Sequence, residues 1–267
     1  MTSTETRKQH RSVSQLKQYL RCPLSYKLSR VDDEWQRPAA WLPQGEAVHE
    51  VIEAWEKSGR TMSLEAAQDL FREAYRRHVH KYTEVTPNFE YWFRSGPYDG
   101  ERDIERRYHI GLEQVAKYIT WCLKHPEERI WVAPDGTPGI ELPFEIELDG
   151  VPVRGYIDLV LCGEYEGEVI PRDVKTGRLP DDELQLAVYG VALAEKYGVE
   201  VRSGDFWMGK SGLATRPYDL TEWSRDLITR LFRELDENIK AERFEPDPEP
   251  SKCSFCDVNS SCPFAVG

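Results

Sequence analysis

The fold is decided by residues 140–161, IELPFEIELDGVPVRGYIDLVL. Apolar residues occupy every second position of the first half of this stretch, which is the pattern of a strand with one buried face. Asp149-Gly150 is a strong hairpin signal, so Val151–Leu161 is expected to return as a second strand. A third strand is expected at about Val169–Val174. The middle of the chain is therefore expected to form a sheet.

Helical periodicity surrounds this sheet on both sides. Ser12 and Gln15 form a capping-box pattern ahead of a first helix, and Pro23 either ends that helix or starts another. The other expected segments are helices through Val48–Trp55, after Ser63, through Ile104–Ile119, over Asp181–Tyr197 and over Thr221–Ala241, a loop over Trp35–Pro43, a strand pair near Val199–Met208 and Ala214–Leu220, and a tail without helical period from Phe244. The expected fold class is α/β (α+β), a small mixed β-sheet flanked by helices, with an N-terminal helical region and a Cys-rich C-terminal tail.

Composition narrows the class of protein. The 267 residues carry 35 Lys+Arg and 47 Asp+Glu, for a net charge of −12, which argues against a broad, nonspecific coat for nucleic acid but leaves room for bound metal cations. The longest nearly apolar run, Leu184–Ala194, is shorter than the ~18 residues that span a bilayer. Met1–His10 has no apolar stretch of the secretory kind. We therefore expect a cytoplasmic protein with no membrane partner.

Acidic and basic side chains stand near the ends of the central strands. Asp158 lies on the returning strand, and Asp173 and Lys175 lie two apart on the next strand, so they share one face. If the two strands pair, Asp158 approaches Asp173, which is unfavourable unless a cation lies between them. Two carboxylates beside an ammonium suit metal-assisted phosphodiester hydrolysis. The alternative is a solvated turn without chemistry.

These residues resemble a known family. Gly155-Tyr-Ile-Asp158 followed by Asp173-Val-Lys175 is similar to the PD-(D/E)XK nuclease superfamily, specifically its RecB-like exonuclease branch. That branch also has a G-x3-H motif, matched by Gly45-Glu-Ala-Val-His49, and a Q-x3-Y motif, matched by Gln185-Leu-Ala-Val-Tyr189. The stretch from Ser12 to Tyr26 is similar to its N-terminal signature. The resemblance is spread over about residues 12–263.

The resemblance implies a restriction-endonuclease-like core and a role for each matching residue. The expected catalytic residues are Asp158, Asp173, Lys175, Gln185 and Tyr189, of which Gln185 and Tyr189 position the nucleic-acid strand and the reactive site. The expected ligands of Mg²⁺ or Mn²⁺ are His49, Asp158, Asp173 and the carbonyl of Val174. The motif acid is Asp173 where Glu is commoner in the family. Glu141, on the polar side of its strand, is expected to be merely exposed.

Six cysteines stand at positions 22, 122, 162, 253, 256 and 262. Clustered cysteines in such a chain are more often metal ligands than disulfides. Cys22 together with Cys253, Cys256 and Cys262 resembles the iron–sulfur subset of the branch, which includes the CRISPR-associated RecB-like exonucleases and the AddB nuclease domain. The resemblance implies a [4Fe–4S] cluster, and a four-thiolate zinc site is the alternative that spacing leaves open. Cys122 and Cys162 are expected to be ordinary buried cysteines.

Basic and aromatic residues offer a route for a DNA strand. They are Arg72, Arg76, Arg77, His78, His80 and Lys81 on one expected helix, Arg102, Arg106 and Arg107 on the next, and Tyr91, Trp92, Phe93 and Tyr98 in the loop between them. The alternative is a solvated helix face.

The expected function is a metal-dependent DNA exonuclease that acts on single strands or DNA ends in recombination, repair or replication, with a phage gene as one expected source. One alternative is a CRISPR-adaptation nuclease that trims prespacers, and another is a catalytically silent DNA-end-binding protein on the same fold. Possible protein partners are a helicase, a recombinase or a CRISPR integrase, and the sequence contains no Walker A motif. A single domain over 1–267 is expected, with a mainly helical part at 12–125, a catalytic core at 128–241 and a closure by 242–267 plus Cys22.

Overall fold

The computed structural model describes residues 10–163, 165 and 167–266. No secretory signal is expected in Met1–His10, and of this segment the structure describes only His10. The helices are α1 (Val13–Arg21), α2 (Pro23–Arg30), α3 (Trp41–Lys57), α4 (Leu64–Val85), the 3-10 helix η1 (Phe89–Tyr91), α5 (Gly100–Lys124), α6 (Leu184–Tyr197), α7 (Arg225–Lys240) and α8 (Pro250–Cys253). The strands are β1 (Ile140–Leu148), β2 (Val151–Cys162), β3 (Val169–Lys175), β4 (Ser203–Met208), β5 (Leu213–Ala214) and β6 (Tyr218–Asp219). Each helix of this described part is too short or too polar to cross a membrane.

The strands form one mixed sheet in the order β1-β2-β3-β4-β5, with β6 also paired to β4. β1, β2 and β3 are antiparallel neighbours, whereas β3 and β4 are parallel and are connected through α6. A parallel pair needs such a crossover connection, which is usually a helix. The small mixed sheet predicted from the sequence is confirmed.

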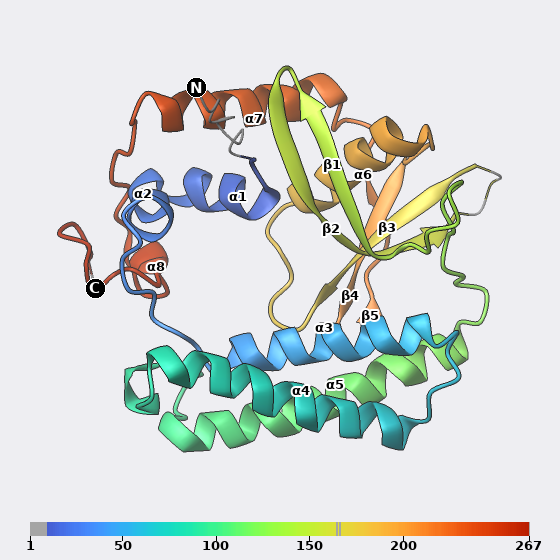
Figure 1. Ribbon diagram of the computed structural model, residues 1–267, viewed down its shortest axis with the longest axis horizontal. Helices are drawn as coiled ribbons and strands as arrows, with labels where there is room; N and C mark the ends of the chain where they lie inside the picture. The colour runs from blue at the N-terminus through green and yellow to red at the C-terminus, as the bar shows by residue number, and fades with distance from the viewer. Residues whose placement is uncertain (1–9, 164, 166, 267) are drawn as a thin grey trace, which may run out of the picture.

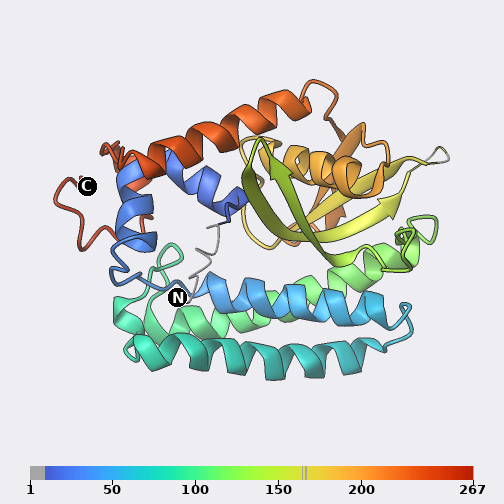
Figure 2. The ribbon, with the colours of Figure 1, turned by 45° about the horizontal axis from the view of Figure 1, so that its top comes forward.

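Helices cover both faces of the sheet (Figures 1 and 2). On one side α3, α4 and α5 enclose a core that includes Val48, Phe71 and Val115 and contacts the sheet through Trp207. On the other side α1, α6 and α7 pack with most of β1 and β2 in a second core. The central strands thus lie between two apolar layers.

Local signals in the sequence explain several element boundaries. The side chain of Ser12 accepts a hydrogen bond from the backbone N–H of Gln15 at 3.3 Å, as the capping pattern predicts. Asp149 and Gly150 both have positive φ, 49° and 83°, as a two-residue type I′ hairpin turn requires. Pro23 is the first residue of α2. These short-range predictions are confirmed.

Other boundaries differ from the sequence-based prediction. α3 begins at Trp41, inside the predicted loop, because Pro43 falls in the first turn, where no intrahelical N–H partner is needed. The tail contains the short helix α8, which begins at Pro250 for the same reason. α6 begins at Leu184 and β4 at Ser203, each later than predicted. Patterns of apolar residues locate these elements but not their ends.

The N-terminal helices α1 and α2 lie beside the C-terminal segment that contains α8 (Figure 1). The hydroxyl of Tyr19 donates a hydrogen bond to the carbonyl of Arg243 at 2.5 Å, and the rings of Tyr26 and Phe244 stack at 6.3 Å. The backbone N–H of Arg37 donates to the carbonyl of Asp257 at 2.7 Å. The C-terminal tail is therefore packed against the N-terminal helices.

Candidate active site

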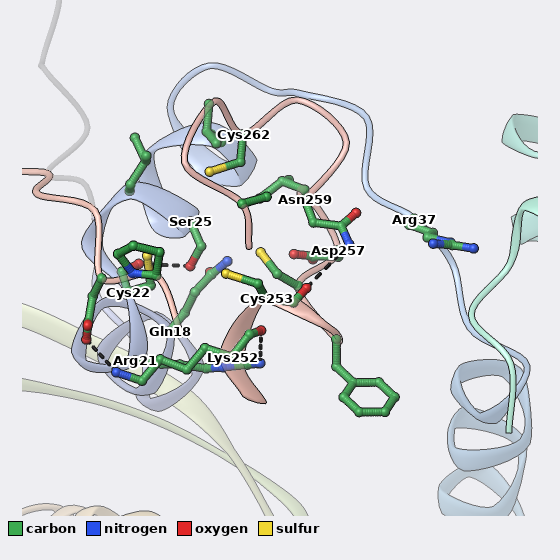
Figure 3. A pocket seen from close by; sticks show the side chains of 18 of the residues that line it. Gln18, Arg21, Cys22, Ser25, Arg37, Lys252, Cys253, Asp257, Asn259 and Cys262 are labelled. Carbon is green, nitrogen blue, oxygen red and sulfur yellow. Dashed lines mark hydrogen bonds and ion pairs between the residues drawn. The ribbon is translucent and has the colours of Figure 1, made fainter. Parts of the chain in front are cut away.

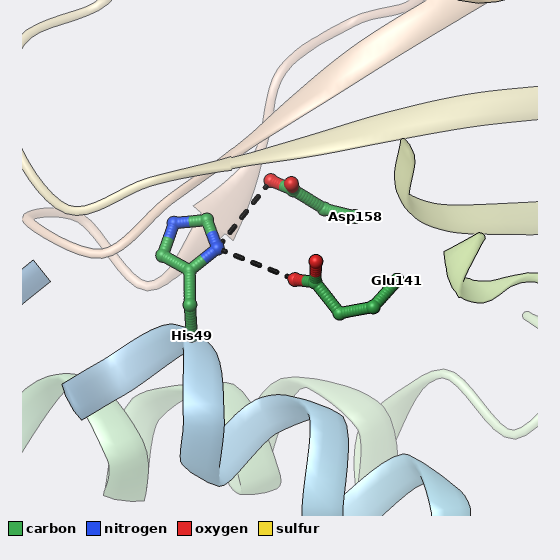
Figure 4. Close-up of side chains that lie close together, drawn as sticks. All are labelled: His49, Glu141 and Asp158. Atoms are coloured by element: carbon green, nitrogen blue, oxygen red, sulfur yellow. Dashed lines mark ion pairs between the residues drawn. The ribbon is translucent and has the colours of Figure 1, made fainter. Parts of the chain in front are cut away.

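Three potential metal ligands converge where α3 faces the β1–β2 hairpin (Figure 4). Nδ1 of His49 lies 3.6 Å from Oδ2 of Asp158 and 3.8 Å from Oε1 of Glu141. One ligand atom from each of the three residues lies within 4.8 Å of the other two. Two oxygen donors and one nitrogen donor at this spacing suit a divalent cation.

Glu141 is a member of this group, so the prediction that it is merely exposed is wrong. It has a left-handed backbone, with φ of 43°, inside β1. As a result, Ile140 packs into the core under α3–α5, whereas Leu142 packs into the core under α6 and α7. Strict alternation would have placed both on one face. The side chain of Glu141 lies against His49, and strain of this kind in a non-glycine residue is typical of functional sites.

One signal in the sequence could have found Glu141. It precedes Asp149 by eight residues, and Asp158 follows Gly150 by eight. A two-residue turn therefore places Glu141 directly across from Asp158, and the observed pairing on either side has this register. An acid opposite an expected metal ligand should have been treated as a second ligand.

Asp173 continues the row of carboxylates onto β3. The β2–β3 ladder starts at Leu159 and Arg172, so Asp158 and Asp173 follow across its end. One oxygen of Asp158 accepts a hydrogen bond from the backbone N–H of Val174 at 2.7 Å. Asp173 does not belong to the group of His49, Glu141 and Asp158, whose ligand atoms lie within 4.8 Å of one another. The role of the Val174 carbonyl as a metal ligand stays a prediction.

The electrostatics of this cluster reflect crowded negative charge. Burial lowers the pKa of His49, but the charge of Asp158, aided by Glu141 and Asp173, outweighs it and raises the pKa to about 9. Burial raises the pKa of Asp158, which the positive charge of His49 opposes and the negative charge of Glu141 reinforces. Burial and then the charge of Asp158 raise the pKa of Asp173 to about 6. Such carboxylates repel one another, and a bound cation would relieve the repulsion.

Lys175 connects the carboxylates to α6. Its Nζ lies 2.6 Å from Oδ2 of Asp173 and donates a hydrogen bond to Oε1 of Gln185 at 3.1 Å. Gln185 in turn donates from Nε2 to the hydroxyl of Tyr189 at 2.7 Å. Tyr189 is buried, and burial followed by the charges of Asp158 and Asp173 raises its pKa. Four of the five side chains predicted to be catalytic thus form one connected row, namely Asp173, Lys175, Gln185 and Tyr189.

The G-x3-H motif has a steric explanation. Gly45 lies one turn before His49 on α3, and a Cβ at Gly45 would come within 3.1 Å of the hydroxyl of Thr176. Thr176 directly follows Lys175. The missing side chain lets α3 approach the end of β3 closely, which brings His49 to the carboxylates.

Four cysteines line a separate cavity of about 390 Å³ between the N-terminal helices and the tail (Figure 3). Cys22 stands between α1 and α2, whereas Cys253, Cys256 and Cys262 come from the tail. No three of their sulfur atoms lie within 4.8 Å of one another. The predicted set of four is therefore assembled around one space, but not in the tight arrangement of a single-ion site.

The other two cysteines lie elsewhere. Cys122 is buried in α5, where burial followed by the charge of Glu56 raises the pKa of its thiol to about 12. Cys162 ends β2 and is only partly buried, so its prediction as a buried residue is wrong.

The expected DNA route over α4 is altered by pairing and burial. Arg77 forms an ion pair with Glu50 at 2.7 Å, and Lys81 with Glu46 at 3.4 Å. Trp92 and Phe93, predicted as loop aromatics, are buried, whereas Tyr91 and Tyr98 are exposed. The cationic face of α4 is thus partly neutralised by α3, and only part of the predicted route is available.

Comparison with known proteins agrees with this geometry. The model of the PD-(D/E)XK nuclease superfamily matches residues 10–263. The chain belongs to the PD-(D/E)XK nuclease superfamily. Its fold is α/β, and membership of a nuclease superfamily implies DNA as the substrate. Members of this superfamily typically use Mg²⁺ or Mn²⁺.

Two relatives are similar over nearly their whole length. The Gene 69 protein of Mycobacterium phage D29 is 56% identical over 261 residues, covering 95% of this chain and 96% of the relative. The Gene 69 protein of Mycobacterium phage L5 is 52% identical over 290 residues, covering 98% and 99%. A crystal structure of a candidate exonuclease from Eubacterium rectale is 13% identical, with a TM-score of 0.49 and coverage of 98% of this chain and 92% of that one.

Proposed function

We propose that this nuclease is a metal-dependent DNA exonuclease that acts on single strands or DNA ends in recombination, repair or replication. The observation that carries the proposal is the convergence of His49, Glu141 and Asp158 beside the ion pair of Asp173 and Lys175. The G-x3-H and Q-x3-Y motifs, which resemble those of RecB-like exonucleases, meet at this place. The two phage-encoded relatives favour a role in phage DNA metabolism over CRISPR adaptation.

The residues present fit a divalent cation. Oδ2 of Asp173 is buried and receives no aligned hydrogen bond from the described residues, although Lys175 is close as an ion pair. Such an oxygen is costly unless a cation or water pairs with it. His49, Asp158 and Glu141 would hold Mg²⁺ or Mn²⁺, with Asp173 beside them. When bound, the ion would supply Lewis-acid polarisation of the scissile phosphate.

Lys175 would act on the charge that develops during cleavage. Its ammonium lies at the edge of the carboxylate row and can donate a hydrogen bond to a non-bridging phosphate oxygen. The contacts with Asp173 and Gln185 fix the direction of the ammonium, and Tyr189 fixes Gln185. A preorganised donor is worth more in the transition state than one that must first reorient.

A [4Fe–4S] cluster held by Cys22, Cys253, Cys256 and Cys262 belongs to the same proposal. A tetrahedral zinc site with Zn–S bonds of about 2.3 Å requires sulfur atoms roughly 3.8 Å apart. The sulfur atoms here are spread around a cavity of about 390 Å³, and no three approach within 4.8 Å. All four cysteines line this one cavity, and that supports a single group shared by them. The cluster would tie α1 and α2 to the tail.

Cleavage of linear and circular single-stranded DNA of one sequence tests the activity. With Mn²⁺ or Mg²⁺ the linear form should be shortened progressively from an end while the circle stays intact, and a chelator should stop the reaction. A circle that is cut as fast as the linear form would reject an exonuclease. Failure to cut any DNA form with either metal would reject the nuclease proposal as a whole.

A further inference from the structure

The cysteine-lined cavity and the active-site hollow adjoin each other at the start of α3. Both are lined by Trp41 and Leu42. Trp41 precedes His49 by eight residues on one helix, which is a rise of roughly 12 Å. About three to four stacked nucleotides span that distance at ~3.4 Å each. A strand whose scissile phosphate lies near His49 can therefore reach Trp41.

Three aromatic rings gather at this junction, and we call them the aromatic patch: Trp41, Phe93 and Phe255. The rings of Trp41 and Phe93 stack at 6.2 Å, and Phe255 lies 6.3 Å from Trp41 and 6.2 Å from Phe93. Phe93 is buried, whereas Phe255 is 52% exposed. An exposed ring on a base of one buried and one partly buried ring is a surface on which a nucleobase can stack.

Positive charge lies beside the aromatic patch. The guanidinium of Arg37 lies 4.6 Å from the ring centre of Phe93 and donates hydrogen bonds to the carbonyls of Tyr91 and Trp92. Arginine has five N–H donors, so others stay available for a phosphate. Among the residues that the structure describes, Arg37 has no carboxylate within 4.0 Å.

The active-site hollow has the opposite charge. The acidic residues that line it are Glu46, Glu50, Glu53, Glu141 and Asp158. A DNA strand is repelled there until a cation is bound, but not at the aromatic patch. The charge distribution therefore favours holding the strand at the patch while its end lies in the hollow.

We infer that the aromatic patch and Arg37 form a single-stranded DNA subsite that holds unpaired bases a few nucleotides from the scissile phosphate. The inference rests on the proposed nuclease function and narrows its substrate from single strands or DNA ends to an unpaired strand. Phe255 stands between Cys253 and Cys256, so the cysteine-lined loop presents the outermost ring of the subsite. The subsite would thereby couple the cysteine site to substrate binding.

Phe255→Ala tests the subsite in two independent measurements. Binding of a fluorescent thymidine decanucleotide, measured by anisotropy with chelator present, should weaken by about 5- to 150-fold, the range for loss of one base-stacking contact. In cleavage with Mn²⁺ the variant should raise KM for the decanucleotide with kcat unchanged, because uniform binding is lost. A thymidine dinucleotide is too short to reach from His49 to Trp41, so its kinetics should not change.

Two control variants separate stacking from other effects. Phe255→Leu keeps an apolar side chain without a ring face and should bind nearly as weakly as Phe255→Ala. Tyr165→Ala removes a ring that is 67% exposed in the β2–β3 connection and should bind like the wild type. Thermal unfolding of each variant should match that of the wild type.

The outcomes distinguish the subsite from the activity. Wild-type decanucleotide affinity in Phe255→Ala, equal affinity of Phe255→Leu and wild type, or equal losses for both substrate lengths would each overturn the subsite. A wild type that binds the decanucleotide through Phe255 but cuts no DNA would instead reject the proposed function and leave the subsite standing.

Discussion

The register of β1 and β2 places Glu141 across from Asp158, so both acids lie near His49. With Glu141 turned inward, one ligand atom from each of three side chains lies within 4.8 Å of the others. We expect Glu141 to be a metal ligand rather than a surface residue.

Glu141→Gln tests this expectation. Removing the charge should lower Mn²⁺ affinity at least about 10-fold, because changes even one layer outside a metal's ligands cost about that much. Cleavage should fall most at low Mn²⁺ and recover in part at high Mn²⁺. Titration calorimetry with Mn²⁺ gives the affinity. Glu145→Gln, an exposed acid on the same strand, is the matched control, and equal affinities for the two variants would contradict the assignment.

Sequence reasoning found most of this site but not all of it. Asp158, Asp173 and Lys175 were predictable because a hairpin followed by a third strand places them at neighbouring strand ends. His49 and Gln185 needed the resemblance, since nothing in a helical period says which polar residue faces a sheet. Glu141 was missed because the polar side of its strand was expected to face solvent, whereas at this end of β1 that side faces His49 of α3.

At the scale of elements, β3 is held in place by a buried ion network next to the site. Arg172, which precedes Asp173, pairs with Asp205 on β4 at 2.6 Å and with Glu128 at 2.5 Å. Burial raises the pKa of Glu128, but the hydrogen bonds and charge of Arg172 outweigh it and lower the pKa below its ordinary value of 4.5. Breaking one arm of such a network leaves charge buried and poorly paired.

Glu128→Gln should lower the free energy of unfolding by about 1.5–3 kcal/mol near neutral pH, the range for a hydrogen bond to a charged group. A carboxyl group whose pKa is lower in the folded than in the unfolded protein stabilises the folded state at pH values above its pKa in the unfolded protein. This stabilisation is lost as the pH falls through its pKa in the folded protein. The difference between variant and wild type should therefore shrink in acid. Urea unfolding at both pH values measures it. The exposed neighbour Glu127→Gln should have little effect, and a pH-independent loss in Glu128→Gln would contradict the account.

Element boundaries show where local patterns stop being informative. The cap at Ser12 and the turn at Asp149-Gly150 are short-range chemistry, so both were predictable. The start of α3 at Trp41 was not, because a Pro- and Trp-rich stretch reads as a loop unless the packing of Trp41 on Phe93 is known. The first residues of α6 and β4 likewise depend on how the sheet and its crossover helix pack.

At the scale of the whole molecule, the cysteine site connects residues that lie far apart in the sequence. Cys22 faces Cys253, Cys256 and Cys262 across a cavity, and the charge of Cys22 contributes to the raised pKa of Cys256 after burial and Asp257. Several thiolates this close are unfavourable without a metal. Binding free energy of a cluster would thus add directly to folding free energy.

Cys22→Ala should give colourless protein with a lower unfolding temperature, because the cluster and the tie between α1 and the tail are lost together. Wild-type protein should be brown, with iron and sulfide near the amounts of one [4Fe–4S] cluster. Visible absorbance and metal analysis are the measurements. Cys162→Ala, away from the cavity, is the control and should keep the colour. Colourless wild-type protein with one zinc ion per chain would show that the four cysteines bind zinc instead of an iron–sulfur cluster.

The central claim is that Lys175 and the carboxylates beside it cut DNA. The most direct measurement is the single-turnover cleavage rate of end-labelled single-stranded DNA by Lys175→Ala at saturating Mn²⁺, with DNA affinity measured on the same sample. The rate should fall at least about 100-fold with affinity nearly unchanged, since the ammonium acts on transition-state charge. Cleavage by Lys175→Ala at the wild-type rate would contradict the account.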